Sequence, residues 1–255
     1  MTPFSLQEEC YPETRFGGFS RVDGTVIFFT RVQALLHGAR IVVDIGCGRG
    51  ARQEDVCAFR RELADLRSGD RTVIGFDVSA AGQNNPFIDE FHRIDERETW
   101  PPEDGFADAI VSDFVLEHLS EPRFFFAEVC RILRPGGYFC ARTTNKWGYV
   151  AIVSRLVPRA RHARVLSILQ KSRKEEDIFP TFYRCNTISS IRGFLNSVRM
   201  ESVVLPIESE PNYFTFSRGL YRCSVFFHRI IPDRFKSTLL VFARKNLTDD
   251  HHVIR

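Results

Sequence analysis

The sequence predicts an α/β fold in which helices wind around a mostly parallel sheet. The first observation is an alternation of short apolar runs with helical patterns between residues 22 and 142. The second is an apolar run at residues 41–43 that leads straight into a glycine-rich turn at residues 44–50. The third is size and composition, since 255 residues with 44% hydrophobic and 26% charged residues suit one large domain with insertions. Such an alternation implies parallel strands joined by right-handed crossovers.

The elements of the first half follow from these patterns. Residues 1–20 look irregular, because Pro12 and the pair Gly17-Gly18 interrupt any regular pattern. Apolar residues at helical spacing predict a helix over residues 22–36. The other expected elements are helices at residues 51–67 and 122–133, the second ended by R-P-G-G, and strands at residues 40–45, 71–78, 90–94, 107–112 and 138–142.

The second half is expected to complete the same fold around two insertions. The pair N-T at residues 186–187 can cap a helix over residues 188–198, and apolar patterns predict strands at 200–207 and 237–244. The expected organisation is a core with an N-terminal extension at residues 1–145, a helical insertion that forms a cap at 146–187, and a C-terminal part of the same fold at 188–255 with a second insertion at 208–236.

Charge and cysteine content narrow the class of protein. The formal net charge is only +3, so overall charge does not call for a nucleic acid partner. The seven cysteines are odd in number and contain no C-x-x-C pair, which favours free thiols in a reducing compartment and predicts a cytoplasmic location. The first residues lack the apolar core of a signal peptide, and no apolar run approaches the ~20 residues of a membrane span.

The glycine-rich turn after the first strand suits one kind of ligand. Glycines let the backbone turn tightly and let a ligand lie against bare main chain. The stretch D-I-G-C-G-R-G at residues 44–50 differs from the G-x-G-x-x-G of a dinucleotide site, and no Lys or hydroxyl follows Gly50 as a phosphate loop requires. A carboxylate beside a glycine turn instead suits S-adenosylmethionine, whose aminoacyl group carries an amine.

Four motifs stand in order along the chain. They are V-D-I-G-C-G-R-G at 43–50, V-I-G-F-D-V-S at 73–79, D-E at 95–96 followed by F-A-D-A-I-V-S at 106–112, and V-L-E-H-L at 115–119 followed by R-I-L-R-P-G-G-Y at 131–138. The set resembles the class I S-adenosylmethionine-dependent methyltransferases. The resemblance implies a Rossmann-like, doubly wound, mostly parallel seven-stranded sheet with an antiparallel last strand, a helical cap formed by the insertions, and S-adenosyl-L-methionine as cofactor.

The rest of the chain also resembles a bacterial group of methyltransferases. The shared stretches are W-G-Y-V at 147–150, F-P-T-F-Y-R-C-N-T at 179–187 and F-A-R-K at 242–245. No substrate follows from that resemblance.

The resemblance implies a role for each residue around the turn. Asp44 and the turn would hold the aminoacyl end of the cofactor, and Asp77 would accept both ribose hydroxyls. Val78 would pack on the adenine face and Asp95 would accept from its exocyclic amine. The alternatives are a helix-capping role for Asp77 and a turn role for Asp95. The expected cofactor-binding set, whose last two members would flank the methionine portion, is Asp44, Gly46, Cys47, Gly48, Gly50, Asp77, Val78, Asp95, Glu96, Asp113 and Phe114.

The stretch after the fourth strand carries the candidate catalytic group. Some methyltransferases of this class place a metal on Glu-x-x-Glu-His here, but Phe114 stands at the first Glu position, so we predict no metal site. His118 is a candidate general base, since neutral imidazole can take a hydroxyl proton near pH 7; the alternative is a histidine hydrogen-bonded to backbone. Tyr183 is the second catalytic candidate, because we expect Tyr183 and Arg184 to face the active-site mouth after the turn at Pro180.

Acceptor recognition is assigned to the two insertions. Residues 146–174 hold eight cationic and no acidic residues, interleaved with apolar ones, which suits a phosphorylated group or peripheral contact with an anionic membrane. The alternative is a solvated cap. Residues 208–236 are rich in aromatic residues and could roof an apolar pocket, pack on the first insertion or form a homodimer contact. The expected substrate contacts are Lys146, Trp147, Tyr149 and Arg184.

The predicted function is methyl transfer from S-adenosylmethionine to a small-molecule, glycan or lipid-linked acceptor, with a hydroxyl as the favoured acceptor. S-D-F-V stands at residues 112–115 in place of N-P-P-Y or D-P-P-Y, which counts against amine methylation of nucleic-acid bases or glutamine. The alternatives are an N-methyltransferase, an RNA methyltransferase and a non-catalytic cofactor-binding subunit. Nucleic acid is disfavoured, because no RNA-binding module is recognised.

Overall fold

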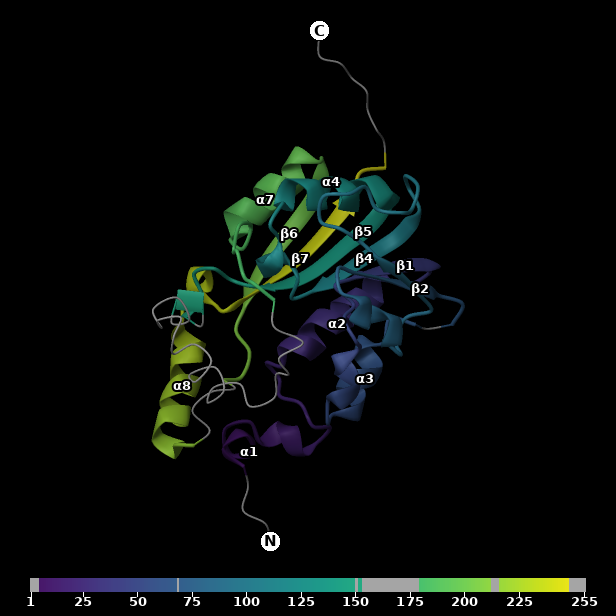
Figure 1. Ribbon diagram of the computed structural model, residues 1–255. Helices are drawn as coiled ribbons and strands as arrows, with labels where there is room; N and C mark the ends of the chain where they lie inside the picture. Colours follow the sequence, from purple (N-terminus) through teal and green to yellow (C-terminus); the bar gives the residue numbers. More distant parts are fainter. Residues whose placement is uncertain (1–4, 68, 150, 153–178, 212–215, 248–255) are drawn as a thin grey trace.

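The computed structural model describes residues 5–67, 69–149, 151–152, 179–211 and 216–247. These residues form a seven-stranded sheet with the strand order β3-β2-β1-β4-β5-β7-β6 (Figure 1). The strands are β1 (Ile41–Ile45), β2 (Thr72–Asp77), β3 (Glu90–Arg93), β4 (Ala107–Asp113), β5 (Leu133–Thr144), β6 (Met200–Ile207) and β7 (Thr238–Lys245). The pairs among β1 to β5 are parallel, whereas β7 runs antiparallel to both β5 and β6. The predicted doubly wound sheet with an antiparallel last strand is confirmed.

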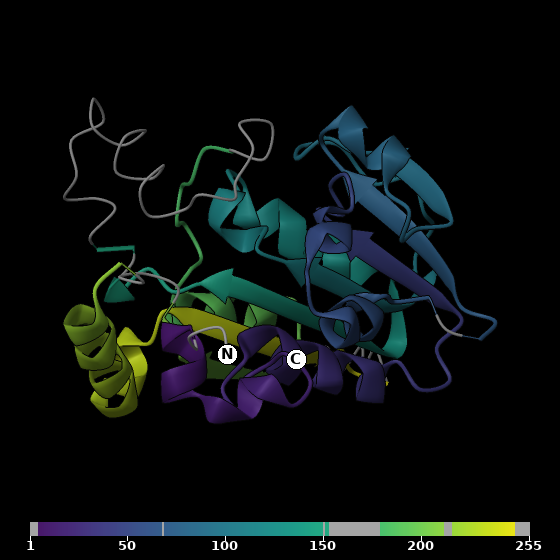
Figure 2. The same cartoon turned by 90° about the horizontal axis from the view of Figure 1, so that it is seen from below.

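Helices cover both faces of the sheet (Figure 2). α4 (Pro122–Ile132) and α7 (Ile188–Ser197) pack on one face. α2 (Gly24–Leu35) and α3 (Ala58–Ala64) pack on the other face. None of the helices in the described part of the chain is long and apolar enough to span a membrane.

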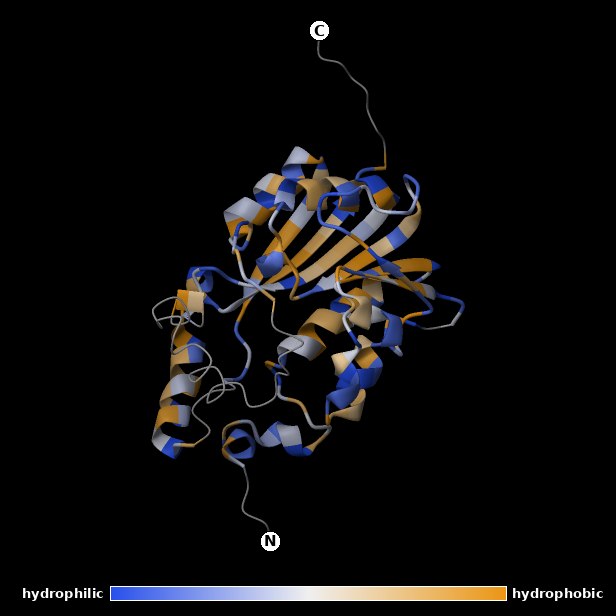
Figure 3. Cartoon of the chain, in the orientation of Figure 1, coloured by the Kyte–Doolittle hydropathy of each residue, from blue (hydrophilic) through white to orange (hydrophobic). Residues whose placement is uncertain are grey.

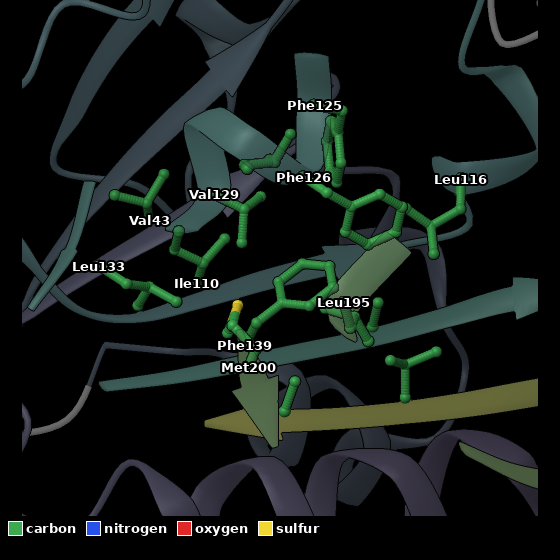
Figure 4. Close-up of a cluster of buried hydrophobic side chains, with 14 of the residues drawn as sticks. Val43, Ile110, Leu116, Phe125, Phe126, Val129, Leu133, Phe139, Leu195 and Met200 are labelled. Atoms are coloured by element: carbon green, nitrogen blue, oxygen red, sulfur yellow. The ribbon is translucent and has the colours of Figure 1, made fainter. Parts of the chain in front are cut away.

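Side chains of the central strands alternate between these two layers. Val43 and Ile110 belong to the cluster beneath α4 and α7, together with Phe126 and Phe139 (Figure 4). Val42, the neighbour of Val43 in β1, belongs instead to the cluster beneath α2 and α3. Because successive side chains of a strand point to opposite faces, a strand buried on both faces is apolar at nearly every position. For this reason short apolar runs were enough to predict the central strands.

Caps fix the helix boundaries that the sequence predicted. α2 begins after Asp23, whose Oδ1 accepts from the backbone N–H groups of Thr25 and Val26 at 2.9 and 3.0 Å. α7 begins after Thr187, whose hydroxyl accepts from the Ser190 N–H at 3.1 Å, as the N-T pair predicted. Such a side-chain cap satisfies a backbone donor that has no partner within the helix.

Two local expectations were wrong. The first twenty residues are not irregular throughout, because residues 6–10 form the helix α1 (Leu6–Cys10). A capping box starts this helix, in which the side chains of Ser5 and Glu8 each accept a hydrogen bond from the other residue's backbone N–H. The helix expected over residues 51–67 is broken into a 3-10 turn, η2 (Ala51–Glu54), and the short α3. The break lies at Asp55, whose Oδ1 accepts from the Cys57 N–H at 2.8 Å and so competes with helical backbone bonds.

The segment between β6 and β7 contains a helix, α8 (Arg218–Ile230), that stands apart from the sheet (Figures 1 and 2). The sequence predicts an aromatic-rich insertion over residues 208–236, and the helix within it is an addition to that prediction. Its buried Tyr221 and Val225 pack against Tyr11, and its His228 accepts from or donates to the Tyr149 hydroxyl at 2.9 Å. Most of the first insertion, residues 153–178, lies outside the described residues, and with it most of the predicted basic segment.

Candidate functional site

A cavity of about 620 Å³ lies at the carboxyl ends of β1, β2 and β4. This edge of an open parallel sheet is where ligands bind in doubly wound folds, and the volume suits a ligand of nucleoside size. Its wall is built mainly from the segments that follow four strands: the glycine turn after β1, the residues at the end of β2, the segment after β3 and the loop after β4.

The glycine turn has the left-handed backbone that only glycine adopts readily. The φ angles of Gly46, Gly48 and Gly50 are +73°, +53° and +77°. A Cβ at Gly46 would lie 2.2 Å from Val115 Cγ2, and a Cβ at Gly50 would lie 2.6 Å from the Asn85 side-chain oxygen. Nothing lies within 4 Å of a Cβ at Gly48. The outer two glycines are therefore required by close packing, while the middle one exposes bare backbone to the cavity.

Asp77, at the end of β2, holds the glycine turn in place through hydrogen bonds to the backbone. One of its carboxylate oxygens accepts from the Gly48 N–H at 2.9 Å and the other accepts from the Ser79 N–H at 2.7 Å. The residue is buried and lines the cavity. Each carboxylate oxygen can accept more than one hydrogen bond, so both oxygens keep the capacity to accept a hydroxyl from the cavity side.

Asp44 is held by an arginine that the sequence analysis did not select. Arg52, in η2, places Nη2 3.2 Å from Asp44 Oδ2, and Arg52 rather than Asp44 lines the cavity. Only 1% of the Asp44 side chain is exposed, against 22% for Arg52. Burial raises the pKa of the Asp44 carboxyl, and the Arg52 guanidinium opposes that rise. Arg52 thus compensates a charge that the fold could not otherwise bury.

A second arginine–aspartate pair supports the loop after β4. Arg142 donates to the two carboxylate oxygens of Asp113 at 2.7 and 2.8 Å, and its guanidinium lies 4.7 Å from the centre of the Phe114 ring. Phe114 has a φ of +58°, and its N–H donates to the Arg142 carbonyl at 2.7 Å. Such a conformation is strained for an aromatic residue and persists because these contacts hold it. Both Asp113 and Phe114 line the cavity.

Only some of the residues predicted to surround the adenine ring line the cavity. Val78 lines the cavity with 40% of its surface exposed, and Glu96 lines it while accepting from the backbone and hydroxyl of Ser120. Asp95 is exposed, is not among the cavity-lining residues, and accepts from the Arg97 N–H at 2.9 Å. Asp95 thus has the turn role that was the alternative to adenine binding.

Cys47, in the glycine turn, is not a reactive thiol. Burial raises the pKa of the Cys47 thiol to about 12, so the thiol stays protonated and is no nucleophile.

His118 lies on the cavity wall with its tautomer fixed. Its Nδ1 is 2.8 Å from the carbonyl oxygen of Pro180, and since a carbonyl can only accept, Nδ1 carries the proton. In the neutral ring Nε2 then has a free lone pair, and Nε2 has no hydrogen-bond partner among the described residues. Phe179 packs edge-on against the imidazole at 6.0 Å and also lines the cavity.

Tyr183 and the candidate substrate residues lie around this wall rather than on it. The Tyr183 N–H donates to the Glu117 carbonyl at 3.2 Å, and Tyr183 is not among the cavity-lining residues. Arg184 is 53% exposed and donates to the Ser120 carbonyl. Trp147 is 51% exposed, whereas the Tyr149 hydroxyl is engaged by α8. Lys146 donates its N–H to the Asn186 carbonyl at 2.8 Å.

Among the residues that the structure describes, no three or more His, Cys, Asp and Glu side chains are grouped to hold a metal ion. None of the seven cysteines, all of which lie within the described residues, forms a disulfide.

Comparison with known proteins identifies the part of the chain that builds this cavity. A family model described as "Methyltransferase domain" matches residues 43–141. A "Probable S-adenosylmethionine-dependent methyltransferase" of Mycolicibacterium smegmatis is 32% identical over 120 residues, which are 45% of this chain and 42% of that protein. A "Ubiquinone biosynthesis O-methyltransferase" of Maricaulis maris is 28% identical over 110 residues, 43% of this chain and 42% of that protein. The chain thus spans about two fifths of the length of these relatives.

Solved structures extend the similarity of fold to most of the chain. A crystal structure of an S-adenosylmethionine-dependent methyltransferase from Mesorhizobium loti aligns with 85% of this chain and 96% of its own length, with a TM-score of 0.51 and 20% identity. At that identity the alignment shows a shared fold and nothing more specific.

Proposed function

We propose that this chain, which carries a class I S-adenosylmethionine-dependent methyltransferase domain, binds S-adenosylmethionine in the cavity at the end of β1 and transfers its methyl group to a hydroxyl acceptor. The observation that carries the proposal is the left-handed turn from Gly46 to Gly50, anchored from behind by Asp77 and open in front of Gly48. A turn of this shape admits a ligand against bare main chain and lacks the Lys and hydroxyl residue of a phosphate loop.

The cavity residues fit the cofactor. Asp77 offers two carboxylate oxygens to the ribose hydroxyls, and Val78 offers an exposed apolar surface to the adenine ring. The aminoacyl end carries both an amine and a carboxylate. Arg52 would pair with the carboxylate, and the carboxylate of Asp113 would accept from the amine. Asp44, behind Arg52, then acts by positioning that arginine.

The chemistry needs a proton acceptor on the wall. When bound, S-adenosylmethionine supplies an electrophilic methyl carbon. The acceptor oxygen forms a bond to that carbon as the sulfur–carbon bond breaks, and the products are a methyl ether and S-adenosylhomocysteine. Nε2 of His118 takes the hydroxyl proton, because the bond from Nδ1 to the Pro180 carbonyl leaves its lone pair free. Phe179 and Leu119 give this part of the wall an apolar surface.

A hydroxyl is the favoured acceptor for two reasons. The free Nε2 of His118 is useful for an oxygen acceptor, whereas an amine acceptor needs mainly orientation and desolvation. One of the similar proteins is named an O-methyltransferase. We propose a small molecule, a glycan or a lipid-linked compound as the acceptor, with Trp147 and Arg184 as contacts outside the cavity.

The first expected result is direct binding of the cofactor. S-adenosylhomocysteine at 100 times its Kd should raise the free energy of unfolding by about 2.7 kcal/mol. Isothermal titration and thermal denaturation with and without the ligand measure this. Adenosine 5′-triphosphate is the control ligand and should bind more weakly, since it lacks the aminoacyl group and the turn lacks the Gly-Lys-Ser/Thr of a phosphate loop. Absence of both heat and thermal shift with S-adenosylhomocysteine would refute the proposed function.

The second expected result concerns Asp77. Asp77→Ala should weaken S-adenosylhomocysteine binding by about 2 kcal/mol, roughly a 30-fold rise in Kd, because two hydroxyls lose a charged acceptor. The variant also frees the Gly48 N–H from its anchor. Asp89→Ala is the matched control, because Asp89 likewise accepts from a backbone N–H, that of Val73, but does not line the cavity. Equal affinity in Asp77→Ala and wild type would remove Asp77 from the binding site.

A further inference from the structure

Helix α8 presents an apolar face to solvent. Leu220, Phe226, Phe227 and Ile230 are between 45% and 63% exposed, although they are large hydrophobic residues. Together with the exposed Cys223 they recur at helical spacing and therefore share one side of the helix. Figure 3 shows apolar residues along α8, which stands apart from the sheet. Contiguous exposed apolar side chains of this kind mark an interaction surface.

The opposite side of α8 attaches it to the rest of the protein. Tyr221 and Val225 are buried against Tyr11, and His228 is buried between the Ser209 carbonyl and the Tyr149 hydroxyl, each 2.9 Å from a ring nitrogen. These three residues of α8 also recur at helical spacing, and they lie roughly opposite the exposed apolar face. The exposed face therefore points away from Tyr11 and the Ser209 carbonyl, while Phe227 at its border contacts the body of the protein, edge-on to the Tyr149 ring at 6.0 Å.

An arginine stripe runs between these two sides. Arg218, Arg222 and Arg229 recur at intervals of four and seven residues, and the sequence from residue 211 to 232 contains no acidic residue. Arg218 and Arg222 contact Glu9 at 2.6 and 3.6 Å, yet their side chains are still 64% and 63% exposed. Tyr149, bonded to α8 through His228, also belongs to the acid-free basic segment 146–174. The arginines thus place positive charge along α8, beside its exposed apolar face.

We propose that α8 docks on the surface of an anionic lipid bilayer. Its apolar face would enter the boundary between headgroups and acyl chains, and its arginines would reach the lipid phosphates. The positive charge of α8 favours an anionic bilayer over a second copy of the chain as the binding partner of this face. Self-association through this face would bring two acid-free, arginine-bearing helices together, whereas an anionic bilayer complements them. The surface is separate from the cofactor cavity, so the proposal does not depend on the proposed function.

Vesicle flotation of the full chain tests the proposal. The protein should float with vesicles of phosphatidylcholine and phosphatidylglycerol, and not with phosphatidylcholine alone, and high salt should weaken the association. The variant Leu220→Ser/Phe226→Ser/Ile230→Ser should lose association at least about tenfold, since these side chains supply the inserted apolar area. Arg229→Glu should reduce it as well. The control Leu247→Ser removes a residue that is 67% exposed and lies beyond β7, and it should float like wild type.

Three outcomes would overturn the proposal. The wild type fails to float with either vesicle, or the triple variant floats like wild type, or wild type is a dimer by light scattering that the triple variant dissociates while neither binds vesicles. The last outcome assigns the face to a second copy of the chain. Thermal denaturation of the triple variant checks that it is folded, and substitution of exposed side chains should leave its stability close to wild type.

Discussion

Arg52→Met is expected to lower the free energy of unfolding by about 3–5 kcal/mol, because it leaves the buried Asp44 carboxylate without its partner. The loss should depend on pH. Burial raises the pKa of Asp44 in the folded state, so its protonation stabilises the fold, and that stability is lost as the pH rises through the raised pKa. Removing Arg52 raises this pKa further. The deficit relative to wild type should therefore be larger at pH 8 than at pH 5, as measured by urea denaturation at both values.

The double variant Arg52→Met/Asp44→Asn separates this cause from simple loss of packing. A neutral amide at position 44 removes the uncompensated charge, so the double variant should regain at least half of the lost stability and most of the pH dependence should disappear. A deficit of the same size at both pH values, with no recovery in the double variant, would show that Arg52 acts through packing alone.

The same arginine has a second expected role in ligand binding. Arg52→Met should weaken binding of S-adenosylhomocysteine, which carries a carboxylate, while the affinity for 5′-methylthioadenosine, which lacks the aminoacyl group, should stay close to wild type. Calorimetry with both ligands measures this difference.

His118→Ala is expected to lower kcat by about 10²–10⁴-fold while leaving the affinity for S-adenosylhomocysteine nearly unchanged. The reason is the loss of Nε2, which is free to take the acceptor's proton because Nδ1 is bonded to the Pro180 carbonyl. Transfer of labelled methyl groups into a panel of phenols and sugars gives the rate for the acceptor that the wild type uses.

His118→Asn distinguishes proton transfer from positioning. An asparagine amide can still donate to the Pro180 carbonyl, but it offers no base in place of Nε2. It should therefore match wild type in thermal stability and be as slow as the alanine variant, and added imidazole should restore part of the alanine variant's rate. Full turnover in His118→Asn would limit His118 to holding the Pro180 turn and would favour an acceptor that needs no base.

Most of the fold could be predicted because its central strands are buried on both faces. The strand at residues 200–207 was found at its observed bounds, and the strand at 237–244 was displaced by one residue. The failures are local. Side-chain bonds such as those of Ser5 with Glu8 and of Asp55 with Cys57 decide whether a short segment starts or stops a helix. The spacing of apolar residues along the sequence carries no information about such side-chain hydrogen bonds.

α8 was missed for a different reason. Its larger apolar stripe lies on the side that faces solvent, while Tyr221, Val225 and His228 on the other side attach it to the rest of the protein. The rule that the apolar stripe of a helix faces the core therefore gives the wrong orientation for α8.

The candidate site was predictable where topology alone places a residue. Asp77 and Asp113 end β2 and β4, the two parallel strands that flank β1, so their meeting at one edge of the sheet follows from strand order. Arg52 does not follow in this way, since its role depends on η2 turning the side chain back onto Asp44. A buried carboxylate requires a partner, and the sequence offers both Arg49 and Arg52 at suitable distances along the chain. Only the three-dimensional structure shows that Arg49 pairs instead with Glu54, at 2.8 Å.

The position of β7 between β5 and β6 has a consequence for how the chain is synthesised. β6 hydrogen-bonds only to β7 within the described sheet, and one edge of β5 is also covered by β7. Until residues 238–245 have left the ribosome, β5 keeps an open edge and β6 has no neighbouring strand. Open edges of this kind invite pairing with other chains. A nascent or truncated chain that stops short of β7 is therefore expected to aggregate or to need a chaperone, even though every cavity residue has already been made.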